Sequence, residues 1–128
     1  MGRIVNYVAI QNVADPSKKI QCEAFVDTGS SLMVLPSAWK ERLGQLEITQ
    51  KVNLELATQE TVQGEICGPV KLQLSGFRPV HTEILFLDMQ PVNGDYEPFI
   101  GSIVLEQSMA VVDMVGHRLI YTAKMDLK

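Results

Sequence analysis

The sequence is poor in the features that mark several large classes of protein. It has 128 residues and a net charge of −4, and its 11 lysine and arginine residues do not cluster, so we expect neither nucleic acid nor a membrane surface as a partner. No apolar run approaches the ~20 residues of a membrane span. The N-terminal segment MGRIVNYVAIQNVAD lacks the apolar core of a signal peptide. These absences predict a single domain, residues 1–128, in the cytoplasm.

Metal, nucleotide and thiol chemistry are also poorly represented. The two histidines, His81 and His117, stand far from any run of metal ligands, and the sequence has no glycine-rich phosphate-binding motif and no G-x-S-x-G motif. The two cysteines, Cys22 and Cys67, are too few for a disulfide framework, so we expect two buried, unreactive thiols in a reducing compartment. The sequence therefore predicts neither a metal ion nor a cofactor.

Strand patterns are what the sequence has in abundance. Residues 20–26 alternate so that Ile20, Cys22, Ala24 and Val26 share one face, as in a half-buried strand. Strands are also predicted over 4–10, 52–58, 64–74, 80–87, 110–115 and 117–122.

Helical signals are few. Residues 36–43 have a proline near the first turn and end at Gly44, and residues 102–109 begin with Ser102 as a possible N-cap. We expect an all-β fold, a small closed or sandwiched sheet with one or two short helices.

One carboxylate stands between two apolar segments, in the stretch EAFVDTGSSLMVLPSAW. Asp27 ends the first segment, and an Asx-type turn would let it accept hydrogen bonds from the backbone N–H groups that follow. Gly29 permits the tight reversal that such a turn requires. A capped turn is the ordinary explanation of an isolated Asp-Thr-Gly. The second apolar-apolar-glycine element at 99–101, again followed by a short helix, argues for more than a turn.

In their order along the chain, these elements resemble the retropepsin-like family of single-domain aspartic proteases. The resemblance rests on Phe25-Val26-Asp27-Thr28-Gly29-Ser30-Ser31, the helix-glycine segment 38–44, the hairpin 52–74 and Phe99-Ile100-Gly101. It extends over roughly residues 4–122 and implies a small closed β barrel with a flap hairpin over a substrate cleft.

The resemblance also implies roles for the residues of the aspartate turn. Asp27 would be the catalytic carboxylate. Thr28 would tie the two active-site loops together across a dimer, and Gly29 would keep the loop close enough for two carboxylates to meet. Ser30 resembles a serine that hydrogen-bonds the catalytic aspartate in two-domain members of the group, whereas many viral members have alanine there.

The chemistry of this family requires two carboxyl groups. One must be ionised to accept a proton from the attacking water, and the other must be protonated to donate to the carbonyl oxygen of the substrate. The chain has a single Asp-Thr-Gly, and its other aspartates lack the Thr/Ser-Gly that would follow. We therefore expect a two-fold symmetric homodimer that joins two copies of Asp27 and hydrolyses a peptide or protein substrate.

The predicted flap has an unusual tip, which consists of Ala57, Thr58, Gln59, Glu60 and Thr61. Viral flaps are rich in glycine here, so we expect this tip to be stiffer and more polar, and its glutamate to disfavour acidic substrates. An ordinary exposed hairpin is the alternative. Two further roles stay open. The loop 88–98 either lines a pocket wall or is simply solvated. Trp39 is expected to anchor the first helix to the sheet, and a contribution to a substrate subsite is the alternative.

Two functions follow from these patterns. The favoured one is an aspartic-type endopeptidase, a hydrolase that uses a water molecule between two aspartates. The alternative is a catalytically weak or inactive module of the same fold that dimerises or binds peptides. Replacement of Asp27 by asparagine distinguishes them, because only the enzyme has an activity for that change to remove.

Overall fold

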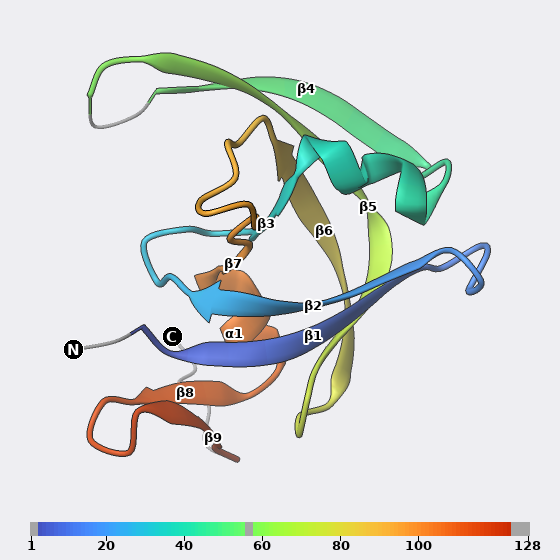
Figure 1. The fold of residues 1–128 in the computed structure, drawn as a ribbon. Helices are drawn as coiled ribbons and strands as arrows, with labels where there is room; N and C mark the ends of the chain where they lie inside the picture. Colours follow the sequence, from blue (N-terminus) through green and yellow to red (C-terminus); the bar gives the residue numbers. More distant parts are fainter. Residues whose placement is uncertain (1–2, 56–57, 124–128) are drawn as a thin grey trace, which may run out of the picture.

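The computed structural model describes residues 3–55 and 58–123, which form nine strands and two short helices (Figure 1). The strands are β1 (Val5–Asn12), β2 (Lys19–Val26), β3 (Met33–Pro36), β4 (Ile48–Glu55), β5 (Thr61–Leu74), β6 (Pro79–Leu87), β7 (Phe99–Ile100), β8 (Ala110–Asp113) and β9 (Arg118–Tyr121). The helices are η1 (Ser37–Leu43), a 3₁₀ helix, and α1 (Ser102–Gln107). Among the described residues, no helix is long and apolar enough to span a membrane. The predicted all-β fold with few short helices is confirmed.

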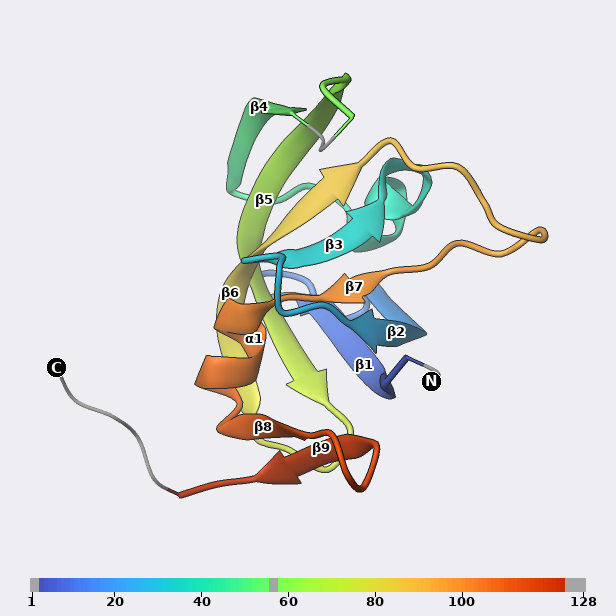
Figure 2. The same cartoon turned by 90° about the vertical axis from the view of Figure 1, so that its left-hand side faces the viewer.

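Seven of the strands form one sheet that closes on itself. Its strand order is β1-β2-β7-β3-β6-β5-β4, and an additional antiparallel pairing of β1 with β5 joins the two sides. Closure leaves fewer unpaired strand edges, which is how small barrels satisfy their backbone groups. The remaining strands, β8 and β9, form a separate two-stranded sheet at the opposite end of the molecule from the β4–β5 hairpin (Figures 1 and 2).

Apolar alternation directs one side of β5 and of β2 into the core, as predicted. In β5 the side chains of Val70, Leu72 and Leu74 are fully buried, while the residues between Val70 and Leu74 that alternate with them are exposed. In β2 the predicted face is also the inner one, with Ile20 and Ala24 buried. The hydrophobic effect therefore fixes the register, since a shift by one residue would expose the whole set.

The two cysteines are free thiols, but only one is fully buried. Cys67 is buried and Cys22 is half-buried, so the prediction of two buried thiols is right for the first and only partly right for the second. Burial raises the pKa of both thiols to about 11. Both are therefore uncharged at neutral pH, as expected of unreactive cysteines.

Helix α1 begins differently from the prediction. Its N-cap is Gly101, and Ser102 lies inside the helix and makes no side-chain capping bond. The backbone N–H groups of Ser102 and Ile103 instead donate to the carbonyl oxygens of Ser30 and Ser31. The donors that a capping hydroxyl usually satisfies are thus satisfied by a loop from another part of the chain.

Helix η1 is a single tight segment that ends at Gly44, as the sequence predicts. Gly44 has φ of 65°, a left-handed conformation that favours glycine. The side-chain amide of Asn12 donates to the carbonyl oxygens of Leu43 (2.8 Å) and Gln45 (2.9 Å) and fixes the end of the helix to β1. Trp39 packs against the core, which confirms its predicted anchoring role.

The β4–β5 hairpin is the predicted flap hairpin, with a longer first strand than expected. Its register runs from Ile48 opposite Gly68 to Glu55 opposite Thr61. β5 also pairs with β6, but this pairing ends at Gly64 opposite Leu87. The outer part of the hairpin therefore extends beyond the barrel as a two-stranded arm (Figure 2). Cys67 lies at a bulge in β5, where the register with β6 shifts before Val70.

Candidate active site

Asp27 lies immediately after β2, where that strand pairs with β7. The pairing is parallel and brings Val26 opposite Ile100. The Asp27 N–H donates to the Ile100 carbonyl oxygen at 2.9 Å, which continues the ladder by one residue. Two segments separated by more than seventy residues in the sequence are thus joined at the aspartate.

The Asp27 side chain forms the Asx turn that the sequence predicts. Its Oδ1 accepts a hydrogen bond from the Gly29 N–H at 3.0 Å, and its carbonyl oxygen accepts one from the Ser30 N–H at 3.1 Å. Asp27 is half-exposed. A carboxylate in this setting is oriented by the backbone and still accessible to a reacting molecule.

The reason for glycine at position 29 differs from the expected one. Gly29 does not have a positive φ, so the turn does not depend on a left-handed residue. Instead, a Cβ atom at Gly29 would lie 3.2 Å from Oδ1 of Asp27. Glycine therefore leaves room for the carboxylate to approach the backbone N–H that holds it.

A second glycine holds the loop against the start of α1. A Cβ atom on Gly101 would lie 2.4 Å from the carbonyl oxygen of Leu32 and 2.5 Å from that of Ser31, which is closer than such atoms approach. The two hydrogen bonds from the helix start, Ser102 N–H to Ser30 (2.8 Å) and the following N–H to Ser31 (3.0 Å), require this close approach. The structure thus brings together the two sequence elements that were singled out, 27–31 and 99–103.

The hydroxyl side chains of Thr28 and Ser30 lie in different surroundings. The Ser30 hydroxyl donates to the Leu32 carbonyl oxygen at 2.9 Å, so it supports the loop backbone. The resemblance had implied that this hydroxyl would bond to the carboxylate of Asp27. Thr28 is exposed and lines a groove of about 210 Å³ together with Met114 and His117 of the β8–β9 turn. The role that the resemblance implies for Thr28 is a contact with the same loop of a second chain.

An apolar row crosses the sheet on the same face as Asp27. The strand registers bring Phe25 opposite Phe99, Phe99 opposite Val34, and Val34 opposite Leu85. Phe25 precedes Asp27 by two residues, which places both side chains on one face. Sequence reasoning did not assign these four residues to a site, although the two-residue spacing between Phe25 and Asp27 was a usable signal.

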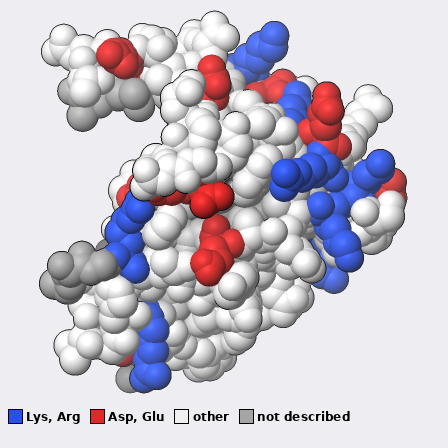
Figure 3. All heavy atoms as spheres, viewed as in Figure 1, with Lys and Arg blue, Asp and Glu red and all other residues white. Residues whose placement is uncertain are grey.

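The flap hairpin stands above the Asp27 loop (Figures 1 and 2), and the molecular surface is hollowed between the hairpin and the barrel (Figure 3). Of the predicted tip residues, Thr58, Gln59 and Glu60 are exposed, Thr61 begins β5, and Ala57 lies outside the described residues. Gln59 has φ of 69°, a left-handed conformation that a side chain disfavours.

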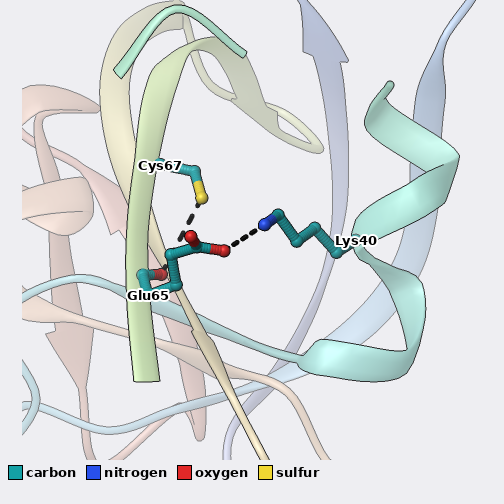
Figure 4. A network of polar contacts seen from close by, with 3 residues as sticks. All are labelled: Lys40, Glu65 and Cys67. Carbon is teal, nitrogen blue, oxygen red and sulfur yellow. Dashed lines mark hydrogen bonds and ion pairs between the residues drawn. The ribbon is translucent and has the colours of Figure 1, made fainter. Parts of the chain in front are cut away.

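The base of the flap hairpin is fixed to η1 by an ion pair between Lys40 and Glu65 (Figure 4). The hydrogen bond from Lys40 to Glu65 raises the pKa of the lysine. The pair borders a pocket of about 480 Å³ that also includes Asp88. The loop 88–98 therefore lines a pocket wall at its first residue, and its Tyr96 makes an edge contact with Trp39 at 5.9 Å between ring centroids.

In the part of the chain that the structure describes, no three histidine, cysteine, aspartate or glutamate residues are grouped so that they could hold a metal ion. The candidate site consists of the Asp27 carboxylate, the tightly packed loop that holds it, the apolar sheet face beside it and the flap hairpin above it.

The comparisons with known proteins place this site in a family. The model of the aspartyl protease family matches residues 13–111, which include Asp27 and Gly101. The chain belongs to the aspartyl protease family. Within it, the chain has a retropepsin-like fold, as the sequence resemblance had implied. Comparison with curated protein sequences gave no match.

Two solved structures share the fold of this retropepsin-like chain. One is the EIAV protease in complex with the inhibitor HBY-793, which has a TM-score of 0.58 and 21% sequence identity over 82% of this chain and 86% of that one. The other is the retroviral protease-like domain of Ddi1 from Leishmania major, which has a TM-score of 0.56 and 15% identity over 97% and 92% of the two chains. At these identities the likeness concerns the fold.

Proposed function

We propose that this protein is an aspartic endopeptidase whose active site forms when two chains bring their Asp27 residues together. The observation that carries the proposal is the Asp27 loop. It holds one half-exposed carboxylate by the Gly29 N–H and is itself fixed by the start of α1. A single chain supplies one such carboxylate, and the chemistry of the family needs two.

In the proposed reaction the two carboxyl groups share one proton, because two carboxylates at about 3 Å do not both ionise. The ionised Asp27 accepts a proton from water as the water oxygen attacks the peptide carbonyl carbon. The protonated Asp27 of the other chain donates its proton to the carbonyl oxygen. As the tetrahedral intermediate breaks down, one carboxyl group protonates the leaving nitrogen and the other takes back a hydroxyl proton, which restores the shared proton.

The remaining parts of the site have matching roles in the proposal. The apolar row Phe25, Phe99 and Val34 lies on the face of Asp27 and provides contacts for substrate side chains. The flap hairpin closes over an extended substrate and excludes water from the reacting groups. Thr28, which lies at the exposed edge of the loop, contacts the partner's loop.

The test is an Asp27→Asn variant with Asp113→Asn as its matched control. Both aspartates accept a hydrogen bond from the N–H of a nearby glycine, Gly29 at 3.0 Å and Gly116 at 2.9 Å, but only Asp27 lies at the proposed site. We expect Asp27→Asn to abolish peptide cleavage with the fold and the dimer unchanged in sedimentation, and Asp113→Asn to keep the activity. Cleavage that survives Asp27→Asn, or a protein that stays monomeric at micromolar concentration at every pH, contradicts the proposal.

A catalytically weak or inactive peptide-binding module is the second candidate. The tip of the flap favours it, because Gln59 adopts a left-handed conformation and Thr58 and Glu60 make the tip polar. Such a tip is less adaptable than one rich in glycine. A parent protein that binds extended peptides and cleaves none supports this candidate.

A reducing, cytoplasmic location is also part of the proposal. Cys22 and Cys67 are free thiols that sit on different strands and are protected by burial, which suits a protein that keeps its cysteines reduced. Recovery of the active protein with both thiols titratable after denaturation supports this location.

A further inference from the structure

A second pocket lies behind the flap hairpin, on the face of the sheet opposite the apolar row. Glu65 lies opposite Lys51 of β4 and opposite Phe86 of β6, so these three side chains share one face. Leu85, the last residue of the apolar row, precedes Phe86 in β6 and therefore points to the other face. Lys51, Glu65 and Phe86 all line the pocket of about 480 Å³ at the base of the hairpin, which we call the back pocket.

The back pocket is separate from the candidate active site. None of the described residues that line it belongs to the Asp27 loop or to the apolar row. It lies between η1, the base of the flap hairpin and the end of β6, and Figure 4 shows Lys40 extending from η1 toward Glu65 on β5. Its volume is within the range of about 300–1,000 Å³ that is typical of sites for small molecules.

Two charged side chains of the back pocket have no ion-pair partner in the described part of the chain. Lys40 and Glu65 form an ion pair and neutralise each other. Lys51 on β4 and Asp88, directly after β6, also line the pocket, and neither is paired with another described residue. A ligand with one charge would satisfy only one of these two groups, whereas a ligand with a carboxylate and an ammonium group satisfies both.

The strand order gives the length of such a ligand. β5 lies between β4 and β6, and neighbouring strands are about 4.8 Å apart, so Lys51 and Asp88 start from strands about 10 Å apart. An extended peptide spans about 3.3–3.6 Å per residue, so about three residues bridge this distance. The amide side chains of Asn53 and Gln63 also line the pocket, and amides both donate to and accept from peptide groups.

We propose that the back pocket binds a short peptide with free termini, about three residues long, whose carboxylate pairs with Lys51 and whose ammonium group pairs with Asp88. Lys51 belongs to the flap hairpin, and Asp88 follows a strand of the closed sheet. The bound peptide therefore joins the base of the flap hairpin to the barrel and holds it in place. The site uses no group of the Asp27 loop, so it is independent of the proposed endopeptidase activity.

The test is a calorimetric titration of triglycine into the wild type and into variants of the two charged residues. We expect the wild type to bind, and we expect Lys51→Met and Asp88→Asn each to weaken binding by at least about tenfold, because each removes one charge-assisted contact. The matched controls are Lys71→Met on β5 and Asp95→Asn in the loop 88–98, two exposed residues that do not line the pocket. Both controls bind triglycine as the wild type does.

Two changes to the probe test the charges and the length of the ligand. N-acetyl-triglycine amide lacks both charges, and glycine is too short to bridge the pocket, so we expect both to bind at least about tenfold more weakly than triglycine. Bound triglycine also slows amide hydrogen exchange in β4. Equal affinity of the wild type, Lys51→Met and Asp88→Asn for triglycine, or no binding to the wild type, overturns the proposal.

The Asp27→Asn variant separates this proposal from the proposed activity. We expect it to bind triglycine as the wild type does, since Asp27 does not line the back pocket. Binding of triglycine by a wild type that cleaves no peptide supports the back pocket and contradicts the endopeptidase. Cleavage by a wild type that does not bind triglycine has the opposite meaning.

Discussion

The Asp27 loop and the flap hairpin face each other across the cleft, and they are held in opposite ways. The loop is bonded to β7 and to the start of α1, and Gly101 allows backbone to pack directly on backbone. The flap has no buried residue in β4, and this strand pairs with β5 alone. A chemical group must be placed to within about half an ångström, whereas a covering element must open to admit a substrate. The difference in support matches these two requirements.

The largest effect on stability is expected for Gly101→Ala, which loosens the Asp27 loop. The added methyl group would lie 2.4 Å from the Leu32 carbonyl oxygen, so the loop and α1 must separate. We expect a loss of about 3 kcal/mol in the free energy of unfolding, measured by urea denaturation.

Gly29→Ala is the matched control in the same loop. Its methyl group would meet only Oδ1 of Asp27, at 3.2 Å, and that side chain is free to rotate. We expect less than about 1 kcal/mol of destabilisation, together with a displaced carboxylate and reduced cleavage. Equal stability losses in the two variants contradict the account of the Gly101 contact.

The local stability of the flap hairpin depends on the contacts at its base. Lys40→Met removes the ion pair with Glu65 and keeps the length of the side chain. We expect amide hydrogens of β4 to exchange up to about fivefold faster, with little change in the barrel, because an ion pair at this exposure contributes less than about 1 kcal/mol. Arg118→Met, which breaks an ion pair in the β8–β9 sheet, is the control and leaves exchange in β4 unchanged. Uniform acceleration throughout the sheet contradicts a local role.

A substitution at the tip of the flap hairpin is expected to change stability by a smaller amount, and to raise it. Gln59→Gly places glycine at a φ of 69°, where a side chain is strained. We expect a gain of about 0.5 kcal/mol in the free energy of unfolding, since the strain is relieved but the unfolded chain gains freedom. Gln63→Gly, within strand β5, is the control and destabilises the protein. A loss of stability in Gln59→Gly indicates that the tip does not hold this conformation in solution.

The smallest effect concerns an aspartate turn outside the cleft. A hydrogen bond from the Gly116 N–H lowers the pKa of Asp113 below its usual 3.8. The contribution of this carboxylate to stability is therefore present above pH 3.8 and is lost as pH falls through its lowered pKa. We expect the urea midpoints of wild type and Asp113→Asn to differ slightly at pH 7 and to converge near pH 2. A difference that persists at pH 2 contradicts this cause.

Local chemistry in the sequence predicted local structure well. The two-residue alternation located seven of the nine strands in the described residues, and Asp27 with its glycine predicted the Asx turn that the structure contains. It missed β3, whose residues are all buried and do not alternate, and β7, which has only two residues. The flap hairpin was also correct in type, although its first strand begins at Ile48, because residues 48–51 at the base of β4 are exposed and carry no alternating apolar pattern.

Contacts between distant segments set the limit of that prediction. Ser102 was a reasonable N-cap from its neighbours alone, but the carbonyl oxygens of Ser30 and Ser31 satisfy the helix start. The hydroxyl of Ser30 bonds to the Leu32 carbonyl oxygen, a contact within the loop that depends on how the loop backbone folds. The pairing of Arg3 with Glu97 joins residues from opposite ends of the chain, and no periodicity reports such a contact.

The strand order has a consequence for handling the protein at high concentration. In the seven-stranded sheet β4 is the member with a neighbour on one side only, and a bare strand edge invites other chains to add to it. Apart from Ile48, its exposed side chains, among them Lys51, Asn53 and Glu55, are polar or charged, which discourages stacking into fibrils. We therefore expect that two copies of the chain can associate without further chains adding to the edge of β4.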